Sequence, residues 1–112
     1  MTIEPPVDAS TQIDRRQFNR RKLAGTIEIE WGSSTLKGLV RDIGPRGLFV
    51  EMATPLWVGA TFLARLIIEP PLQLNCTVRR VEPGMGIAVT FELPEESGKV
   101  QLETLLAQLP KI

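Results

Sequence analysis

The sequence predicts an all-β domain, an antiparallel barrel or sandwich, followed by one C-terminal helix. Three features carry this prediction: six short apolar-rich segments, most with apolar residues at every second position, glycine- and proline-rich turns between them, and a last segment with leucines at helical spacing. Parallel pairing would require helical crossovers, and the links between the six segments are too short to hold them. At 112 residues the chain is long enough for one core and one domain.

The first three strands are expected at residues 26–31, about 36–43 and 48–52. Ile27, Ile29 and Trp31 alternate with polar residues, which gives the first strand one apolar face. Residues 32–34 form the turn to the second strand, and a Gly-Pro-Arg-Gly tetrapeptide reverses the chain before the third. The third strand alternates in the same way, so we expect one face of each strand to point into a shared core.

The next three strands are expected at residues 62–68, 72–79 and 87–91. The segment 62–68 is nearly all apolar, which predicts a strand covered on both faces. Pro70 and Pro71 end it, and Pro83 and Gly84 separate the last two strands. Those two strands again carry apolar residues at alternate positions, namely Leu72, Leu74, Cys76 and Val78 in one and Ile87, Val89 and Phe91 in the other.

The final segment changes from a two-residue period to a helical one. Its apolar stripe follows the i, i+3, i+4, i+7 spacing of an amphipathic helix and consists of Leu102, Leu105, Leu106 and Leu109. Pro94 suits a first helical turn, because its missing N–H needs no partner there, and Pro110 ends the helix. We expect a helix that begins near residues 94–97 and packs its leucines against the barrel.

The N-terminal residues differ from the rest of the chain. Residues 1–14 carry two prolines and small polar residues without an apolar period, which predicts a flexible arm before a domain over residues 15–112. This segment lacks the apolar middle of a secretory signal, and no window approaches the roughly 18 apolar residues of a membrane span. The lone Cys76 permits neither an internal disulfide nor a multi-cysteine metal site. We expect a cytoplasmic protein without membrane insertion, metal or cofactor.

The composition argues against catalysis. The chain has no histidine and no tyrosine, and no nucleophile–base pair or metal cluster can be assembled from its residues. We therefore expect no enzymatic activity and no catalytic residues. The 13 basic and 13 acidic residues cancel, which argues against general binding of nucleic-acid polymers. The balance is local, however, because basic residues crowd one short segment: Arg15, Arg16, Arg20, Arg21 and Lys22.

Three arginines immediately before the first strand form the first candidate binding element. Arg15, Arg16 and Arg20 lie on a stretch that is too polar for the core. A guanidinium group donates to phosphate oxygens in pairs and also stacks on a nucleobase. The segment is therefore interpreted as an anion-binding arm; the alternative is a solvated charge run beside a domain.

The turn after the second strand forms the second candidate element. Asp42 stands at its entrance, and its carboxylate can accept the two adjacent donors of a guanine edge, the N1–H and the exocyclic amine. Gly44 and Gly47 are able to take positive φ and to let a flat ligand approach the backbone. By itself such a turn is common wherever a chain reverses.

Together the two elements resemble the PilZ family, whose signature is an R-R-x-x-x-R arm followed by D/N-x-S-x-x-G. The matching residues are Arg15, Arg16 and Arg20 in the arm and Asp42, Gly44 and Gly47 in the turn. The segment Gly84–Phe91 is similar to the glycine-containing final strand of the family. The resemblance implies a six-stranded Greek-key barrel with a C-terminal helix, and a cyclic di-GMP ligand held between the arm and the barrel.

The resemblance also implies a role for each matching residue. Arg16 and Arg20 would grip phosphate and guanine, Arg15 would add phosphate or stacking contacts, and Asp42 would bind a guanine edge. Gly44 replaces the serine of the family and removes a hydroxyl group. Because a hydrogen bond contributes about 0.5 to 1.5 kcal/mol, or about 3 to a charged group, this replacement predicts weaker binding.

The function expected from these residues is that of a receptor and adaptor. Binding of cyclic di-GMP would order the arginine arm against the barrel and expose a surface to an unidentified effector protein. One alternative is a PilZ-like interaction module in a pilus or motility assembly that binds no nucleotide. A second alternative, general nucleic-acid binding through the arm, is disfavoured by the zero net charge.

Five further residues carry weaker expectations. Arg80 falls in phase with the apolar face of its strand, which predicts a β-bulge there. Trp57 either anchors another protein or closes one end of the barrel. Trp31 is expected in the core with Cys76, and Arg46 is expected as a solvated loop residue.

Overall fold

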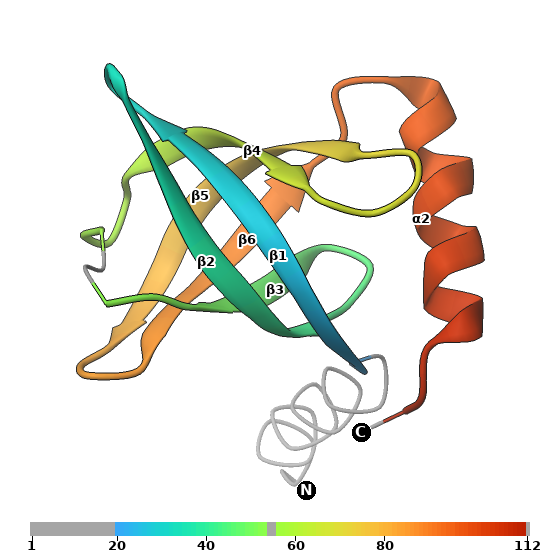
Figure 1. The fold of residues 1–112 in the computed structure, drawn as a ribbon, viewed down its shortest axis with the longest axis horizontal. Helices are drawn as coiled ribbons and strands as arrows, with labels where there is room; N and C mark the ends of the chain where they lie inside the picture. Colours follow the sequence, from blue (N-terminus) through green and yellow to red (C-terminus); the bar gives the residue numbers. More distant parts are fainter. Residues whose placement is uncertain (1–19, 54–55, 112) are drawn as a thin grey trace, which may run out of the picture.

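The computed structural model describes residues 20–53 and 56–111. The expected arm over residues 1–14 and the arginines at positions 15 and 16 lie outside the described residues. The elements (Figure 1) are β1 (Arg21–Trp31), β2 (Ser34–Ile43), β3 (Gly47–Glu51), β4 (Thr61–Leu66), β5 (Leu72–Glu82), β6 (Gly86–Glu92) and α2 (Glu96–Gln108).

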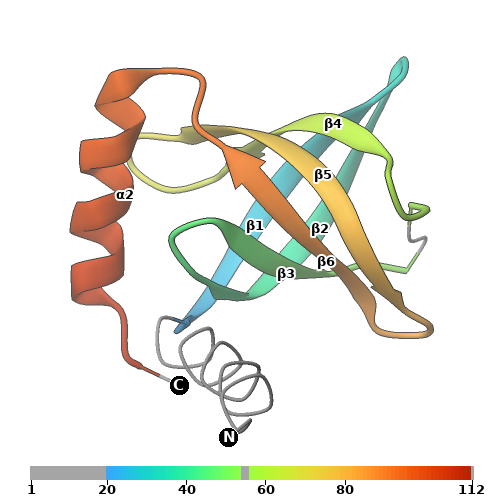
Figure 2. The same ribbon diagram turned by 180° about the vertical axis from the view of Figure 1, so that it is seen from behind.

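The six strands close into an antiparallel barrel in the order β1-β2-β3-β6-β5-β4. Strands β4, β5 and β6 are joined as neighbours, and β6 lies beside β3, while β1 closes the barrel by pairing with β4 (Figures 1 and 2). The order β3-β6-β5-β4 is that of a Greek key. The all-β fold with a C-terminal helix is therefore confirmed, and the closed ladder decides for a barrel over a sandwich.

The core consists of the alternating inward residues of all six strands. Ile27, Ile29, Leu74 and Ile87 are fully buried, and Cys76 lies among them as expected. Burial of these side chains accounts for most of the stabilisation of such a barrel, at about 25 cal/mol per Å² of apolar surface. The expectation for Trp31 was wrong: its side chain is only partly buried and packs on the margin of the core, beside the turn that joins β1 to β2.

The bounds of two strands extend beyond the apolar alternation. β1 begins at Arg21, five residues before the expected start, because its first residues pair with the end of β2. β5 continues to Glu82 through a register shift between Val78 and Arg80. This shift confirms the β-bulge expected at Arg80, whose side chain is exposed.

The strand β4 corrects the expectation of a segment covered on both faces. Its residues alternate between buried and exposed, and the outward-facing Leu63 is 56% exposed. The reason is the position of α2, which stands at one end of the barrel beside the loop between β4 and β5 and leaves the outer face of β4 uncovered (Figures 1 and 2). Gln101 of α2 donates to the carbonyl of Pro70 in that loop.

The helix α2 packs its leucines against the barrel as expected. Leu102 is buried, and the other three leucines of the stripe are partly buried against the core. After the helix, the chain returns to the start of β1: the Lys22 N–H donates to the Pro110 carbonyl at 3.0 Å, and Arg21 forms a β-bridge with Lys111. The described helix is too short and too polar to cross a membrane.

Trp57 lies on the surface rather than inside one end of the barrel. It is 63% exposed and meets Trp31 in an edge-to-face arrangement, with ring centroids 4.9 Å apart and planes at 79°. Val58 beside it is 61% exposed. Of the two alternatives for Trp57, a position that closes one end of the barrel core is wrong, and an exposed position is observed.

Candidate functional site

The antiparallel β1–β2 hairpin brings Arg20 and Asp42 together. Lys22 pairs with Asp42, so the residue just before β1 lies beside the end of β2. Arg20 Nε and Nη2 both donate to Asp42 Oδ1, at 2.9 and 2.5 Å. The two side chains are 21% and 11% exposed, so the ion pair is largely shielded from water. Residues 22 positions apart in sequence therefore form one charged pair at this end of the barrel.

The turn between β2 and β3 completes this arrangement. The Gly47 carbonyl accepts hydrogen bonds from Arg20 Nη1 at 3.0 Å and from the Gly44 N–H at 2.8 Å. Hence the structure brings Arg20, Asp42, Gly44 and Gly47 to one place, which we call the Arg20–Asp42 site.

The expectation of positive φ at the two turn glycines was wrong. Within the described residues, positive φ occurs at Gly32, Gly59, Gly84 and Gly86, and neither turn glycine is among them. Gly47 is required for a different reason. A Cβ at this position would lie 2.6 Å from the Val89 carbonyl oxygen of β6, which is shorter than the contacts that Cβ atoms make in proteins. The absent side chain lets β3 approach β6 at the site.

Arg41 is a member of the site that the sequence analysis missed. Its Nε donates to Asp42 Oδ2 at 3.2 Å, and its guanidinium carbon lies 3.9 Å from the centroid of the Phe49 ring. Strict alternation would put Arg41 and Asp42 on opposite faces of β2. The β2–β3 ladder, however, shifts register between Val40 and Asp42, so Arg41 is the extra residue of a bulge. The only sequence signal was the arginine adjacent to Asp42.

Phe49 supports this contact from the outer side of the barrel. It lies between the core residues Leu48 and Val50, so alternation directs its ring outward. It is nevertheless 1% exposed, and it pairs with Asp42 across the β2–β3 ladder. A cation held over an aromatic face contributes about 0.5 to 2 kcal/mol. The ring therefore fixes the Arg41 guanidinium beside the carboxylate.

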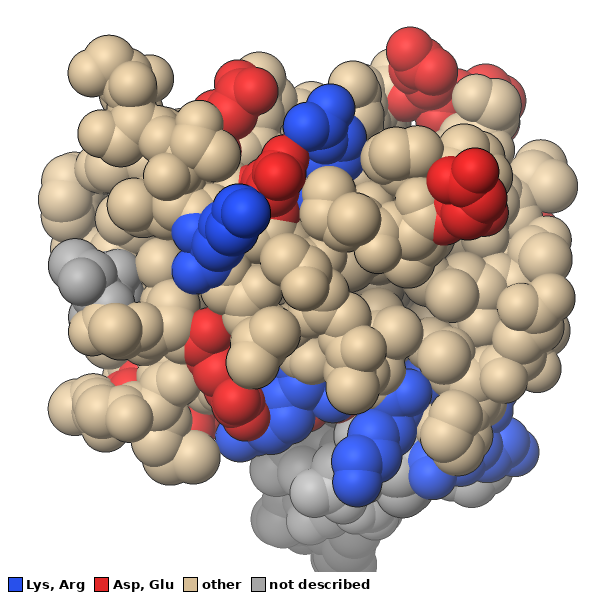
Figure 3. All heavy atoms as spheres, in the orientation of Figure 1, with Lys and Arg blue, Asp and Glu red and all other residues tan. Residues whose placement is uncertain are grey.

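The site combines one carboxylate with two guanidinium groups. Arg20 occupies one oxygen of Asp42 and Arg41 the other. Such a set can bind a ligand that carries both donors for the carboxylate and phosphate oxygens for the arginines. Figure 3 shows basic side chains gathered along the lower edge of the face, at the end of the barrel where β1 begins. Arg46, in the same turn, is exposed as expected.

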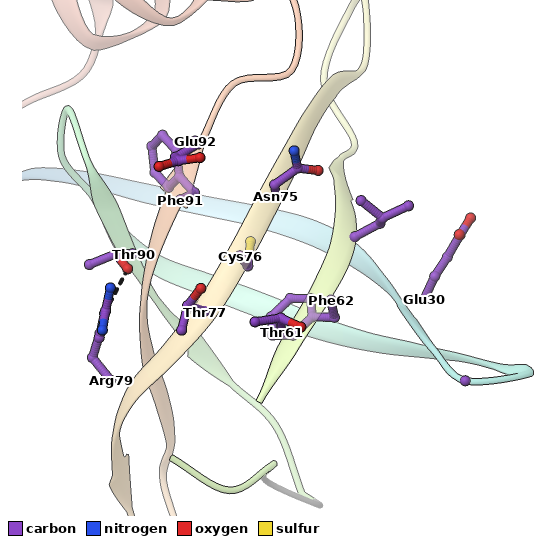
Figure 4. Close-up of a pocket in the computed structure, with 12 residues that line it drawn as sticks. Glu30, Thr61, Phe62, Asn75, Cys76, Thr77, Arg79, Thr90, Phe91 and Glu92 are labelled. Atoms are coloured by element: carbon purple, nitrogen blue, oxygen red, sulfur yellow. Dashed lines mark hydrogen bonds between the residues drawn. The ribbon is translucent and has the colours of Figure 1, made fainter. Parts of the chain in front are cut away.

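A separate groove of about 640 Å³ lies on the outer face of β4, β5 and β6. Its walls include Thr61, Asn75, Thr77 and Thr90, and Arg79 Nε donates to Thr90 Oγ1 at 2.9 Å (Figure 4). None of the residues of the Arg20–Asp42 site lines it. The groove is bordered by two acidic side chains, Glu30 and Glu92, and one basic side chain, Arg79, so its lining does not favour an anion. We therefore place the candidate ligand site at Asp42, where two guanidinium groups meet one carboxylate.

Residues 20–53 and 56–111 hold no group of three or more acidic or cysteine side chains that could bind a metal ion. In the same part of the chain, every buried side-chain nitrogen or oxygen has a hydrogen-bond partner. The polar chemistry that the structure describes is thus that of hydrogen bonds and ion pairs.

Comparison with solved structures supports the fold. The Bacillus subtilis inhibitor of motility (MotI/DgrA) is similar with a TM-score of 0.68 and 16% identity, over 84% of this chain and 50% of that chain. The PilZ domain of CeSA from a cellulose-synthesizing bacterium is similar with a TM-score of 0.61 and 16% identity, over 79% of this chain and 94% of that chain. The chain therefore spans half the length of the first protein and nearly all of the second.

A search of curated protein sequences finds no match to the chain. The model of the PilZ domain family, in contrast, matches residues 14–108, which include the whole barrel and helix α2. The match begins just before the arginine segment and spans the turn that follows β2. The chain belongs to the PilZ domain family.

Proposed function

We propose that this PilZ domain is a cytoplasmic receptor for cyclic di-GMP that binds the dinucleotide without chemical change. The observation that carries the proposal is the convergence of Arg20 with Asp42 and the Gly47 carbonyl at one end of the barrel. A carboxylate and a guanidinium group at this separation match the two recognisable parts of a guanine nucleotide, the base edge and the phosphate.

Binding requires an exchange of partners at Asp42. In the structure both oxygens of the carboxylate accept hydrogen bonds from arginines. A guanine that donates its N1–H and exocyclic amine to Asp42 must displace Arg20 from Oδ1. The released Arg20 is then available for phosphate, as are Arg15 and Arg16, which precede it in the chain.

The displacement of Arg20 offers a route to a partner protein. Arg20 directly precedes β1, whose first residues are joined to the C-terminal segment through the Lys22–Pro110 hydrogen bond and the Arg21–Lys111 bridge. We propose that rearrangement of the arginine segment on binding changes this neighbourhood and presents it to an effector protein. Similarity to an inhibitor of motility makes motility one process to examine, although this similarity covers only half of that protein.

Isothermal titration of the full chain with cyclic di-GMP tests the receptor proposal. We expect saturable binding, loss of binding in Asp42→Asn, and much weaker binding of cyclic di-AMP, because adenine lacks the paired donors that the carboxylate accepts. Absence of heat at ligand concentrations up to the millimolar range would exclude the receptor function.

A second function is favoured by two different observations. Gly44 lacks the hydroxyl of the family motif, and Trp57 and Val58 are exposed side by side. These features suit a PilZ-like module that works through protein contacts alone. A negative titration combined with loss of a protein partner in Trp57→Ala would favour this module over the receptor.

A further inference from the structure

The Arg41 guanidinium is held on two sides by its own neighbours. Its Nε donates to Asp42 Oδ2 at 3.2 Å, and its central carbon lies 3.9 Å from the Phe49 ring centroid. The side chain is still 40% exposed. It is therefore both fixed in position and open to solvent.

Arg20 and Arg41 differ in the donors that they have left for a ligand. Arg20 uses Nε, Nη1 and Nη2 on Asp42 and the Gly47 carbonyl, so it has to break a contact before it binds anything else. Arg41 uses only Nε, and neither of its terminal amino groups donates to another described residue. Arg41 is thus the arginine of the site that can accept a ligand without losing an existing hydrogen bond.

We propose that Arg41 is a phosphate-binding residue of the Arg20–Asp42 site, which donates its two terminal amino groups to a phosphodiester of the ligand. The inference rests on the proposed nucleotide function and adds to it a residue outside the arginine arm and the turn motif. A planar guanidinium fork matches two phosphate oxygens, and the contacts with Asp42 and Phe49 restrict its rotamers before the ligand arrives. The entropy loss on binding is correspondingly smaller.

The position of Arg41 also couples recognition of the phosphate to recognition of the base. Its Nε stays on Oδ2 of Asp42 while its terminal amino groups take the phosphate, so one ligand can contact the carboxylate and the guanidinium together. Gly44 provides no hydroxyl donor at this turn. Arg41 supplies charged donors to the same ligand and offsets part of that loss.

The test is isothermal titration of the full chain with cyclic di-GMP at two salt concentrations, using Arg41→Ala, Arg41→Lys and Phe49→Leu. We expect binding at least about tenfold weaker in Arg41→Ala, since two charge-assisted hydrogen bonds are lost. Arg41→Lys keeps the positive charge but loses the planar guanidinium group, and Phe49→Leu keeps Arg41 but removes the aromatic ring beneath it. The affinities of both variants should therefore lie between those of Arg41→Ala and the wild type. The salt dependence of the affinity should also decrease in Arg41→Ala, because one cation no longer faces the phosphate.

Arg65→Ala serves as the matched control, because Arg65 is also a half-exposed strand arginine in an ion pair, with Glu28 on the far ladder between β1 and β4. Its affinity should equal that of the wild type. Thermal unfolding of each variant establishes whether it is folded. If Arg41→Ala does not fold, the affinity of Arg41→Lys decides whether Arg41 binds the phosphate. Wild-type binding with unchanged affinity in the Arg41 variants would overturn this inference and leave the receptor function intact, whereas no wild-type binding would reject both.

Discussion

Arg20 and Asp42 form an asymmetric ion pair in which two guanidinium nitrogens approach the same carboxylate oxygen. Nε and Nη2 lie 2.9 and 2.5 Å from Oδ1, while Oδ2 is left to Arg41. A bidentate pair would instead place one nitrogen on each oxygen. The pair therefore occupies Oδ1 of Asp42 and joins the start of β1 to the end of β2.

This pair should contribute measurably to stability. In a double-mutant cycle of Arg20→Ala and Asp42→Asn, we expect a coupling free energy of about 1.5 to 3 kcal/mol, because the hydrogen bonds are charge-assisted and shielded. The free energy of unfolding from denaturant titration measures it. In thermal unfolding each single variant should melt roughly 5 °C or more below the wild type.

The Arg65–Glu28 pair provides the comparison. Its side chains are 52% and 27% exposed, so the same cycle should give a coupling of at most about 1 kcal/mol. Equal coupling energies in the two pairs would contradict the role assigned to burial at Arg20 and Asp42.

Gly47→Ala should destabilise the fold and disturb the site. Its Cβ would lie 2.6 Å from the Val89 carbonyl oxygen, so β3 and β6 must move apart. Overpacking of this kind costs about 1 to 3 kcal/mol, measurable as a lower denaturant midpoint. Gly25→Ala is the control, because its Cβ would make ordinary contacts with Leu23 only and its stability should stay near that of the wild type.

Gly44→Ser should strengthen binding of cyclic di-GMP. The backbone of Gly44 does not have positive φ, so a serine fits its conformation, and its hydroxyl restores the donor of the family motif. One hydrogen bond corresponds to an affinity gain of about threefold to tenfold in isothermal titration. Gly44→Ala adds the Cβ without the hydroxyl; if it gained as much as the serine variant, the hydroxyl would not be the cause.

Cys76 should be unreactive in the folded protein. Burial raises the pKa of its thiol to about 12, so at pH 8.5 almost no thiolate is present, whereas an exposed cysteine near its ordinary pKa is about half ionised. Alkylation by iodoacetamide, followed by mass spectrometry, should be at least about a hundredfold slower than in guanidinium chloride, because the rate follows the thiolate fraction. A similar rate with and without denaturant would place Cys76 outside the core.

Most of the barrel was predictable because strand periodicity is local. Apolar residues at alternate positions, or in one continuous run at residues 62–68, located all six strands, and the spacing of the leucines located the helix α2. The errors arose where the burial of a side chain depends on an element that is distant in the sequence. Leu63 looked buried in an apolar run but faces solvent, since α2 stands at the end of the barrel and does not cover β4.

The site was predictable only in part. Arg20, Asp42, Gly44 and Gly47 followed from the motif, and the structure brings them together, while Arg15 and Arg16 stay predictions outside the described residues. Arg41 was missed, because alternation directs it away from Asp42. A bulge in β2 turns the Arg41 side chain toward Asp42, and no local sequence pattern predicts this bulge.

The sequence by itself determined which segments form strands, which of their faces are apolar, and which residue types are available to bind an anion. Tertiary structure alone decided that β1 closes the barrel on β4, that Phe49 lies under Arg41, and that Arg20 rests on one oxygen of Asp42. The physical reason is the separation along the chain of the residues that interact. Periodicity reports forces between neighbours along the chain, whereas closure, bulges and ion pairs depend on residues that meet only after folding.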